Sequence, residues 1–153
     1  MSGEIKFRAW DKENNKMWFM GQEGEETGEC TDRGIWSFQS YFKQGCLEAM
    51  IIRSFCNGVG YEDEVVKLPI MQYTGLKDKN GKEIYEGDIL SIKIYSGDKV
   101  IVEGKTVVEF KDGCFGVIWG HDKAFLSLNS FFKAKFEVIG NIYENPELLR
   151  GEK

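Results

Sequence analysis

Hydrophobic and polar residues alternate over many short stretches of this 153-residue chain, and clusters of turn-forming residues separate these stretches. Alternation with a period of two is typical of β-strands that bury one face. The clearest example lies within residues 90–95, where Leu90, Ile92 and Ile94 alternate with Ser91, Lys93 and Tyr95. The pattern therefore predicts a mainly β protein.

The N-terminal part begins with an alternating stretch, residues 5–10, and a second apolar stretch, residues 17–20. The polar residues 11–16 between them predict a β-hairpin whose loop is longer than the two-residue minimum. Trp10 stands near Arg8, and a cation–π contact between them is one interpretation. The simpler alternative is that the tryptophans only cover the edge of the core.

The region after this hairpin is harder to interpret. Residues 21–34 are acidic and rich in glycine, and we expect a mobile surface loop. Residues 35–42 favour a strand, while Phe42–Met50 is compatible with a short helix weakened by Gly45. Residues 51–55 favour a strand again, so the secondary structure of residues 35–60 stays open.

The second half of the chain contains four or five short strands joined by tight turns. Asn80-Gly81 predicts a type I′ turn, and Asp112-Gly113 predicts another hairpin. Asp88 is placed to accept backbone N–H groups where a strand begins. After the final strand, Asn145 is expected to cap a short C-terminal helix that has Pro146 in its first turn. These elements predict a small meander closed into a partly open β-barrel.

We expect two domains. Residues 1–68 form a β-rich N-terminal lobe that contains the acidic loop, and residues 69–153 form a small barrel on which the hairpin lobe packs. With 42% hydrophobic residues, the chain can bury a core without metals or disulfides. A net charge of −5 argues against a generic binder of duplex nucleic acid. No signal peptide or membrane span is evident, so we expect a cytoplasmic protein. The four scattered cysteines predict free thiols.

Candidate chemistry is sparse. His121 is the sole histidine, and no serine or cysteine near it resembles an activated nucleophile, so we interpret it as a turn residue. Glu83, Glu86 and Asp88 could bind a divalent cation, but neighbouring lysines would neutralise them. The sequence thus predicts no catalytic residues, no metal ligands and no cofactor.

Three phrases of the chain resemble the YopX protein family: KFRAWD at 6–11, MQYTGLKDKNGKEIYEGDI at 71–89 and VIGNIYENPELL at 138–149. Residues 21–67 lie in a part that varies in this family and add no support. The resemblance implies a mainly β protein with a Src-homology-3-like small barrel, encoded by a phage or prophage of Gram-positive bacteria. It implies no established activity and no catalytic residues.

Three functions remain open. The leading hypothesis is a non-catalytic protein-binding module, a phage accessory protein that acts on a host or phage protein. A single-stranded nucleic-acid-associated protein is the alternative, and a small metal-dependent hydrolase is the second alternative. A homo-oligomer through edge-strand pairing is also considered. The candidate binding residues lie in and beside the central turn: Tyr73, Lys77, Lys79 and Lys82.

Overall fold

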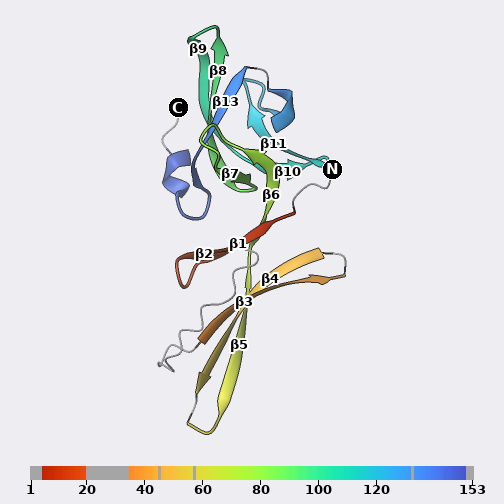
Figure 1. The fold of residues 1–153 in the computed structure, drawn as a ribbon, viewed down its shortest axis with the longest axis vertical. Coiled ribbons are helices and arrows are strands. Elements are labelled where there is room, and N and C mark those ends of the chain that lie inside the picture. The colour runs from red at the N-terminus through yellow and green to blue at the C-terminus, as the bar shows by residue number, and fades with distance from the viewer. Residues whose placement is uncertain (1–4, 20–34, 45, 57, 132, 151–153) are drawn as a thin grey trace. The chain divides into compact units, whose positions relative to one another are not determined.

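A computed structural model describes residues 5–19, 35–44, 46–56, 58–131 and 133–150. The described residues form strands β1 to β13 and two short 3-10 helices, η1 and η2, so the predicted mainly β class is confirmed (Figure 1). The acidic segment 21–34, for which we expected a mobile loop, lies outside the described residues. The chain divides into two compact units, Lys6–Met71 and Gln72–Lys153, the latter together with Met1–Ile5.

The first unit begins with an antiparallel hairpin of β1 (Phe7–Asp11) and β2 (Lys16–Phe19). The buried carboxylate of Asp11 holds its turn, because it accepts hydrogen bonds from the backbone N–H of Asn14 (3.2 Å) and from the indole N–H of Trp18 (3.1 Å). Trp10 and Trp18 are both buried, so these rings belong to the core. A cation–π contact does form in this hairpin, between Lys16 and Trp18.

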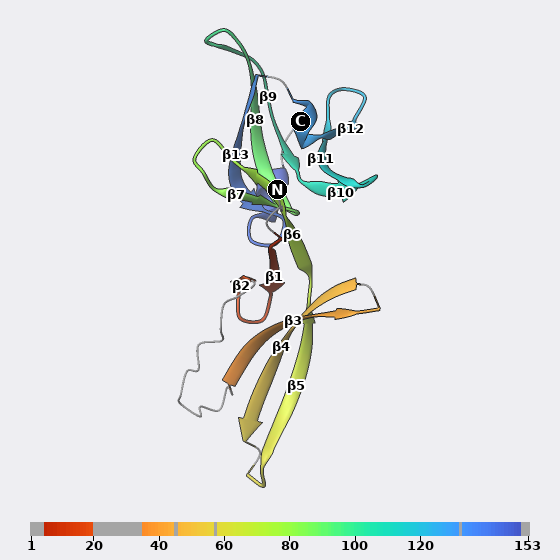
Figure 2. The same ribbon diagram turned by 45° about the vertical axis from the view of Figure 1, so that its right-hand side comes forward.

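The remaining strands of this unit form an antiparallel sheet in the order β3-β4-β5, with β3 at Ile35–Lys43, β4 at Cys46–Cys56 and β5 at Tyr61–Leu68 (Figures 1 and 2). The helix considered for Phe42–Met50 is therefore wrong. Lys43 is paired directly with Cys46, and β4 lies between two partner strands. Backbone hydrogen bonds on both sides outweigh the weak local preference for a helix.

The second unit is built around β8 (Asp88–Ser96), which lies between β13 (Ala134–Asn141) and β9 (Lys99–Val107) in an antiparallel sheet (Figure 2). β6 (Ile70–Lys77), which begins at the boundary of the units, pairs with β7 (Glu83–Tyr85). The sheet order leaves β13 and β9 as the outer strands. The outer edges of these two strands have different surroundings.

A smaller antiparallel sheet contains β10 (Glu109–Lys111), β11 (Cys114–Trp119) and β12 (Ala124–Ser127), followed by η1 (Leu128–Ser130). Asp112 and Gly113 both have positive φ, at 53° and 79°, so the predicted Asp-Gly hairpin turn is confirmed. The short C-terminal helix is η2 (Pro146–Leu149). Asn145 does not cap it through its side chain, whose Oδ1 accepts the N–H of Asn141 instead (3.4 Å).

The core of the second unit lies where these strands curl into a half-barrel (Figure 1). Its buried side chains are Ile84, Leu90, Ile92, Val108, Val117 and Leu128. The predicted alternation in β8 is confirmed, since Leu90 and Ile92 are fully buried and Ile94 packs against them. Phe110, by contrast, is 53% exposed because β10 is an outer strand, and its ring lies against Phe115 (centroids 5.0 Å apart).

Candidate functional site

The structure does not bring the four predicted binding residues together as one surface. Tyr73 is only 6% exposed, and its ring packs against Tyr85 at a centroid distance of 5.5 Å. Lys77, Lys79 and Lys82 are exposed. Lys79 forms an ion pair with Glu137 of β13 (Nζ to Oε2, 3.2 Å). Tyr73 thus contributes to packing, and the lysines alone lie at the surface.

The turn Asp78–Lys82 is organised by the buried carboxylate of Asp78. Its Oδ1 accepts the backbone N–H groups of Asn80 (2.8 Å) and Lys82 (2.9 Å), and its Oδ2 accepts that of Val138 in β13 (3.0 Å). The predicted type I′ turn at Asn80-Gly81 is wrong, because only Gly81 of that pair has positive φ. The backbone instead turns at Lys79-Asn80, where the N–H of Gly81 donates to the carbonyl of Asp78 (3.0 Å).

Electrostatics support a structural role for Asp78. Burial by itself would raise the pKa of this carboxyl group. The backbone N–H donors of Val138, Lys82 and Asn80, together with the charge of Lys82, outweigh burial and hold the pKa of Asp78 below its ordinary value. The N–H of Lys79 also donates to the carbonyl of Phe136 in β13 (2.9 Å). The turn therefore covers the outer edge of β13 with hydrogen bonds.

The carboxylates that could have bound a cation have separate surroundings. Asp88 is buried at the start of β8, and its Oδ2 accepts the N–H of Tyr85 (2.8 Å), as the sequence predicted. Glu86 is half-buried, and burial raises its pKa. Burial and the charge of Glu86 together raise the pKa of Tyr143. Among the described residues, no group of three or more His, Cys, Asp or Glu side chains is placed to hold a metal ion.

His121 lies in the exposed turn after β11, where the sequence placed it. It contributes to the rim of a shallow groove of about 550 Å³ between β9 and β11. The groove is lined by Val102, Glu103, Gly104, Lys105, Ile118, Trp119, Gly120 and His121. Gly104 makes room for the ring of Trp119, since a Cβ atom there would lie 2.9 Å from Cη2 of that ring.

The outer edge of β9 beside this groove has an apolar surface. Val100, Ile101 and Val102 are 44%, 60% and 43% exposed, and Lys99 and Glu103 flank them. In the described part of the chain, β9 is the last strand of its sheet. Its C-terminal half approaches β11, where the Thr106 hydroxyl donates to the carbonyl of Ile118 (2.9 Å). Residues 99–103 precede that contact and are exposed throughout.

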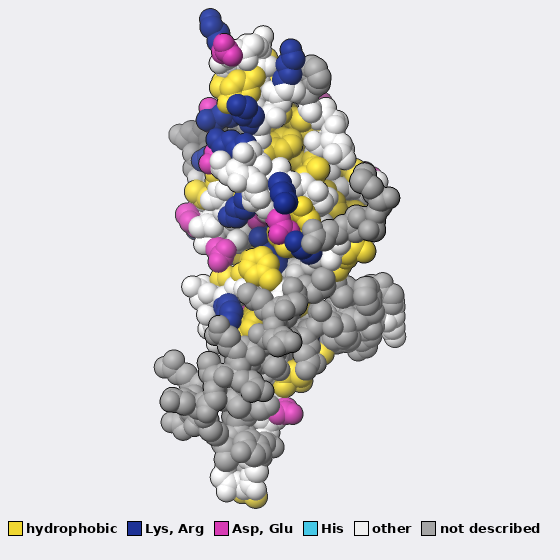
Figure 3. Space-filling view, viewed as in Figure 1, with side chains coloured by type: hydrophobic (Ala, Val, Ile, Leu, Met, Phe, Trp, Pro, Cys, Tyr) yellow, Lys and Arg dark blue, Asp and Glu magenta, His cyan; other side chains and the backbone are white. Residues whose placement is uncertain are grey.

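One face of the β13-β8-β9 sheet is rich in lysine, and Figure 3 shows Lys and Arg side chains gathered over this part of the molecule. Lys93 lies directly opposite Lys135 in the strand register. Lys93 also approaches Glu103 (3.9 Å), and Lys135 lies 5.0 Å from the ring centre of Tyr95. Like charges placed directly opposite destabilise a sheet, so this face carries an electrostatic cost.

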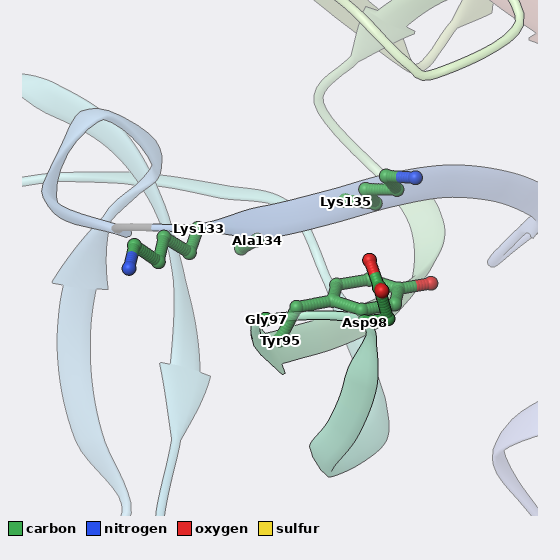
Figure 4. A pocket seen from close by; sticks show the side chains of 6 residues that line it. All are labelled: Tyr95, Gly97, Asp98, Lys133, Ala134 and Lys135. Atoms are coloured by element: carbon green, nitrogen blue, oxygen red, sulfur yellow. The ribbon is translucent and has the colours of Figure 1, made fainter.

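A second depression, of about 430 Å³, lies beside this face and is lined by Tyr95, Gly97, Asp98, Lys133, Ala134 and Lys135. Figure 4 shows the carboxylate of Asp98 next to the ring of Tyr95, while Lys133 extends away from that ring. Its lysines therefore do not converge on one point, and the carboxylate of Asp98 also lines this depression. This arrangement does not form a defined anion site.

Residues 100–102 were not predicted as a candidate surface. The signal was present, because three consecutive apolar residues interrupt the alternating pattern of this region. An exposed run of this kind is unfavourable unless it has a function. By itself, the apolar run at residues 100–102 indicates only a strand. The sheet order shows that this strand, β9, lies at an edge.

These features describe a mainly β protein of two units with an open sheet edge and without a recognisable catalytic centre among the described residues. The chain belongs to the YopX protein family, whose pattern it matches over residues 6–150. A search of curated proteins found no match. None of the helices in the described ranges is long and apolar enough to cross a membrane.

Two solved structures are similar to this chain over nearly its whole length. Protein EF1440 from Enterococcus faecalis is 28% identical with a TM-score of 0.57, and the match covers 97% of this chain and 100% of that one. Protein yopX from Bacillus subtilis is 25% identical with a TM-score of 0.59, covering 95% and 98% of the two chains. Neither description names an activity.

Proposed function

We propose that this chain is a non-catalytic protein-binding module of a phage or prophage, which acts on a host or phage protein in the bacterial cytoplasm. The observation that supports this proposal is the open apolar edge of β9 at Val100–Val102. An open edge offers unpaired backbone groups to an extended segment of a partner protein, which adds to the sheet as a further strand. The segment's side chains would enter the groove over Trp119.

A comparison of outer strands supports the choice of β9. β5 is also an outer strand, of the β3-β4-β5 sheet, but it carries Glu62, Asp63 and Glu64 along its first half. Charged side chains are a common protection of sheet edges against pairing. β9 lacks this protection over its three apolar residues. The short antiparallel strands that curl into a half-barrel also support our inference that this unit is related to Src-homology-3-like barrels, many of which bind peptides.

The test is selection of extended peptides from a random-peptide library on the full chain, followed by affinity measurement on variants. Peptides that bind along β9 should lose at least about tenfold in affinity for Ile101→Lys, because a buried, unpaired charge opposes the contact. Val65→Lys is the matched control, since Val65 is 56% exposed on the outer strand β5. Equal binding to both variants, or no selected peptide, would contradict the proposal.

A second candidate, a protein that associates with single-stranded nucleic acid, is favoured by the opposed pair Lys93 and Lys135 beside Tyr95. Phosphate groups would relieve the repulsion between the lysines, and bases stack on aromatic rings. Binding of labelled oligo(dT), measured by fluorescence polarisation, should weaken steeply with salt and be lost in K93Q/K135Q. No binding at low salt would exclude this function.

A further inference from the structure

The exposed segment of β9, Lys99–Glu103, is complementary to itself. Its sequence KVIVE begins with a positive charge, ends with a negative charge and has three apolar residues between them. If two copies align antiparallel with Ile101 opposite Ile101, Lys99 of each copy faces Glu103 of the other. Val100 of each copy then faces Val102 of the other.

We infer that a second copy of this chain binds along the β9 edge in this antiparallel register. The inference rests on the proposed function, because it names the partner of the same edge. Opposite charges and apolar residues directly across a strand pair each stabilise the pairing. A two-fold symmetric interface uses the same patch on both copies, which a self-complementary segment satisfies.

The strand register within one copy leaves Ile101 available for this contact. Ile94 of β8 pairs with Val102 and Tyr95 pairs with Val100, so Ile101 has no direct partner on β8. Such bulges often reduce pairing at an edge. In the proposed register, Ile101 is the most exposed apolar side chain of the segment and lies at the symmetry centre, opposite Ile101 of the other copy.

The paired sheet would have one lysine-rich face. The two-fold axis between antiparallel strands runs perpendicular to the sheet, so the same face of both copies lies on one side. Lys93 and Lys135 of each copy would therefore share one surface. Self-association would double the basic area without changing the acidic total charge of the chain.

The experiment is a mass measurement by light scattering on the full chain, with two charge-reversal variants. The native chain of 17.5 kDa should form dimers in the micromolar range. K99E and E103K should each weaken dimerisation by about tenfold or more, because each replaces two attractive pairs by two repulsive pairs. K12E, the same charge change in an exposed turn of the other unit, should dimerise as the native chain does.

An equimolar mixture of K99E and E103K supplies the decisive measurement. In the mixed dimer both cross-strand pairs are attractive again, so dimers should return, and this return also shows that both variants are folded. A monomeric native chain, or variants that dimerise alone as well as mixed, would overturn the inference. The native chain could be monomeric while selected peptides still bind Ile101→Lys more weakly than they bind the native chain. In that case the proposed protein-binding function stands, and only the proposed partner, a second copy of the chain, is wrong.

Discussion

The two outer edges of the β13-β8-β9 sheet differ in what covers them. At β13, the turn Asp78–Lys82 covers the edge, with Asp78 accepting the N–H of Val138 and Lys79 donating to Phe136. At β9, residues 100–102 leave apolar side chains in solvent. The turn Asp78–Lys82, whose charged residues are prominent in the sequence, thus covers the edge of β13. The edge of β9 stays uncovered at residues 100–102, although its sequence is that of an ordinary strand.

Replacing Asp78 should break the covered edge and produce the largest effect. Asp78→Ala leaves three backbone N–H groups without their acceptor, and we expect a loss of about 3 kcal/mol in the free energy of unfolding. Urea denaturation measures this loss. Lys79→Ala, which removes only the exposed ion pair with Glu137, should cost less than about 1 kcal/mol. Similar losses in both variants would contradict the role assigned to Asp78.

The stabilising contribution of Asp78 to the covered edge should also depend on pH. The pKa of Asp78 is lower in the folded chain than its ordinary value of 3.8, so its stabilising contribution is fully present above that value. It is lost as the pH falls through the folded pKa, where the group becomes protonated in both states. Urea midpoints of the native chain and Asp78→Asn should therefore converge below about pH 4. A difference that stays constant even well below pH 4 would exclude this explanation.

At the open edge, Gly104→Ala should have a moderate effect by changing the wall of the groove. The new Cβ meets the Trp119 ring at 2.9 Å, and the ring must move. We expect a loss of about 1 kcal/mol in stability and a shift in tryptophan fluorescence. Weaker binding of selected peptides should accompany that shift. An unchanged spectrum would show that Trp119 does not pack on Gly104.

The smallest effect is expected for Ile101→Thr. The side chain is 60% exposed, so its replacement should change the free energy of unfolding by no more than about 0.5 kcal/mol. Thermal unfolding of a sample dilute enough to be monomeric measures this change. A loss comparable to that of Asp78→Ala would show that residues 100–102 stabilise the folded monomer, and the contrast between the edges would disappear.

Local signals predicted much of the second unit. The positive φ values at Asp112 and Gly113 follow from the residue types, and Asp88 binds a nearby N–H through a contact that spans only three residues. The predicted type I′ turn at Asn80-Gly81 is wrong because the carboxylate of Asp78 accepts the backbone N–H groups of Asn80 and Lys82 and so holds the backbone in a different turn. One of its three acceptor bonds reaches Val138, 60 residues away, and no local pattern reports such a distance.

The sequence by itself determined the β class, most strand positions and the alternating core of β8, because side-chain periodicity is a local property of the chain. Only the tertiary structure decided that Tyr73 is buried, that Phe42–Lys43 and Cys46–Met50 belong to strands and that β9 is an outer strand. These outcomes depend on which strands become neighbours. The candidate binding surface arises from that pairing, since an apolar run is an exposed edge only when no other strand covers it.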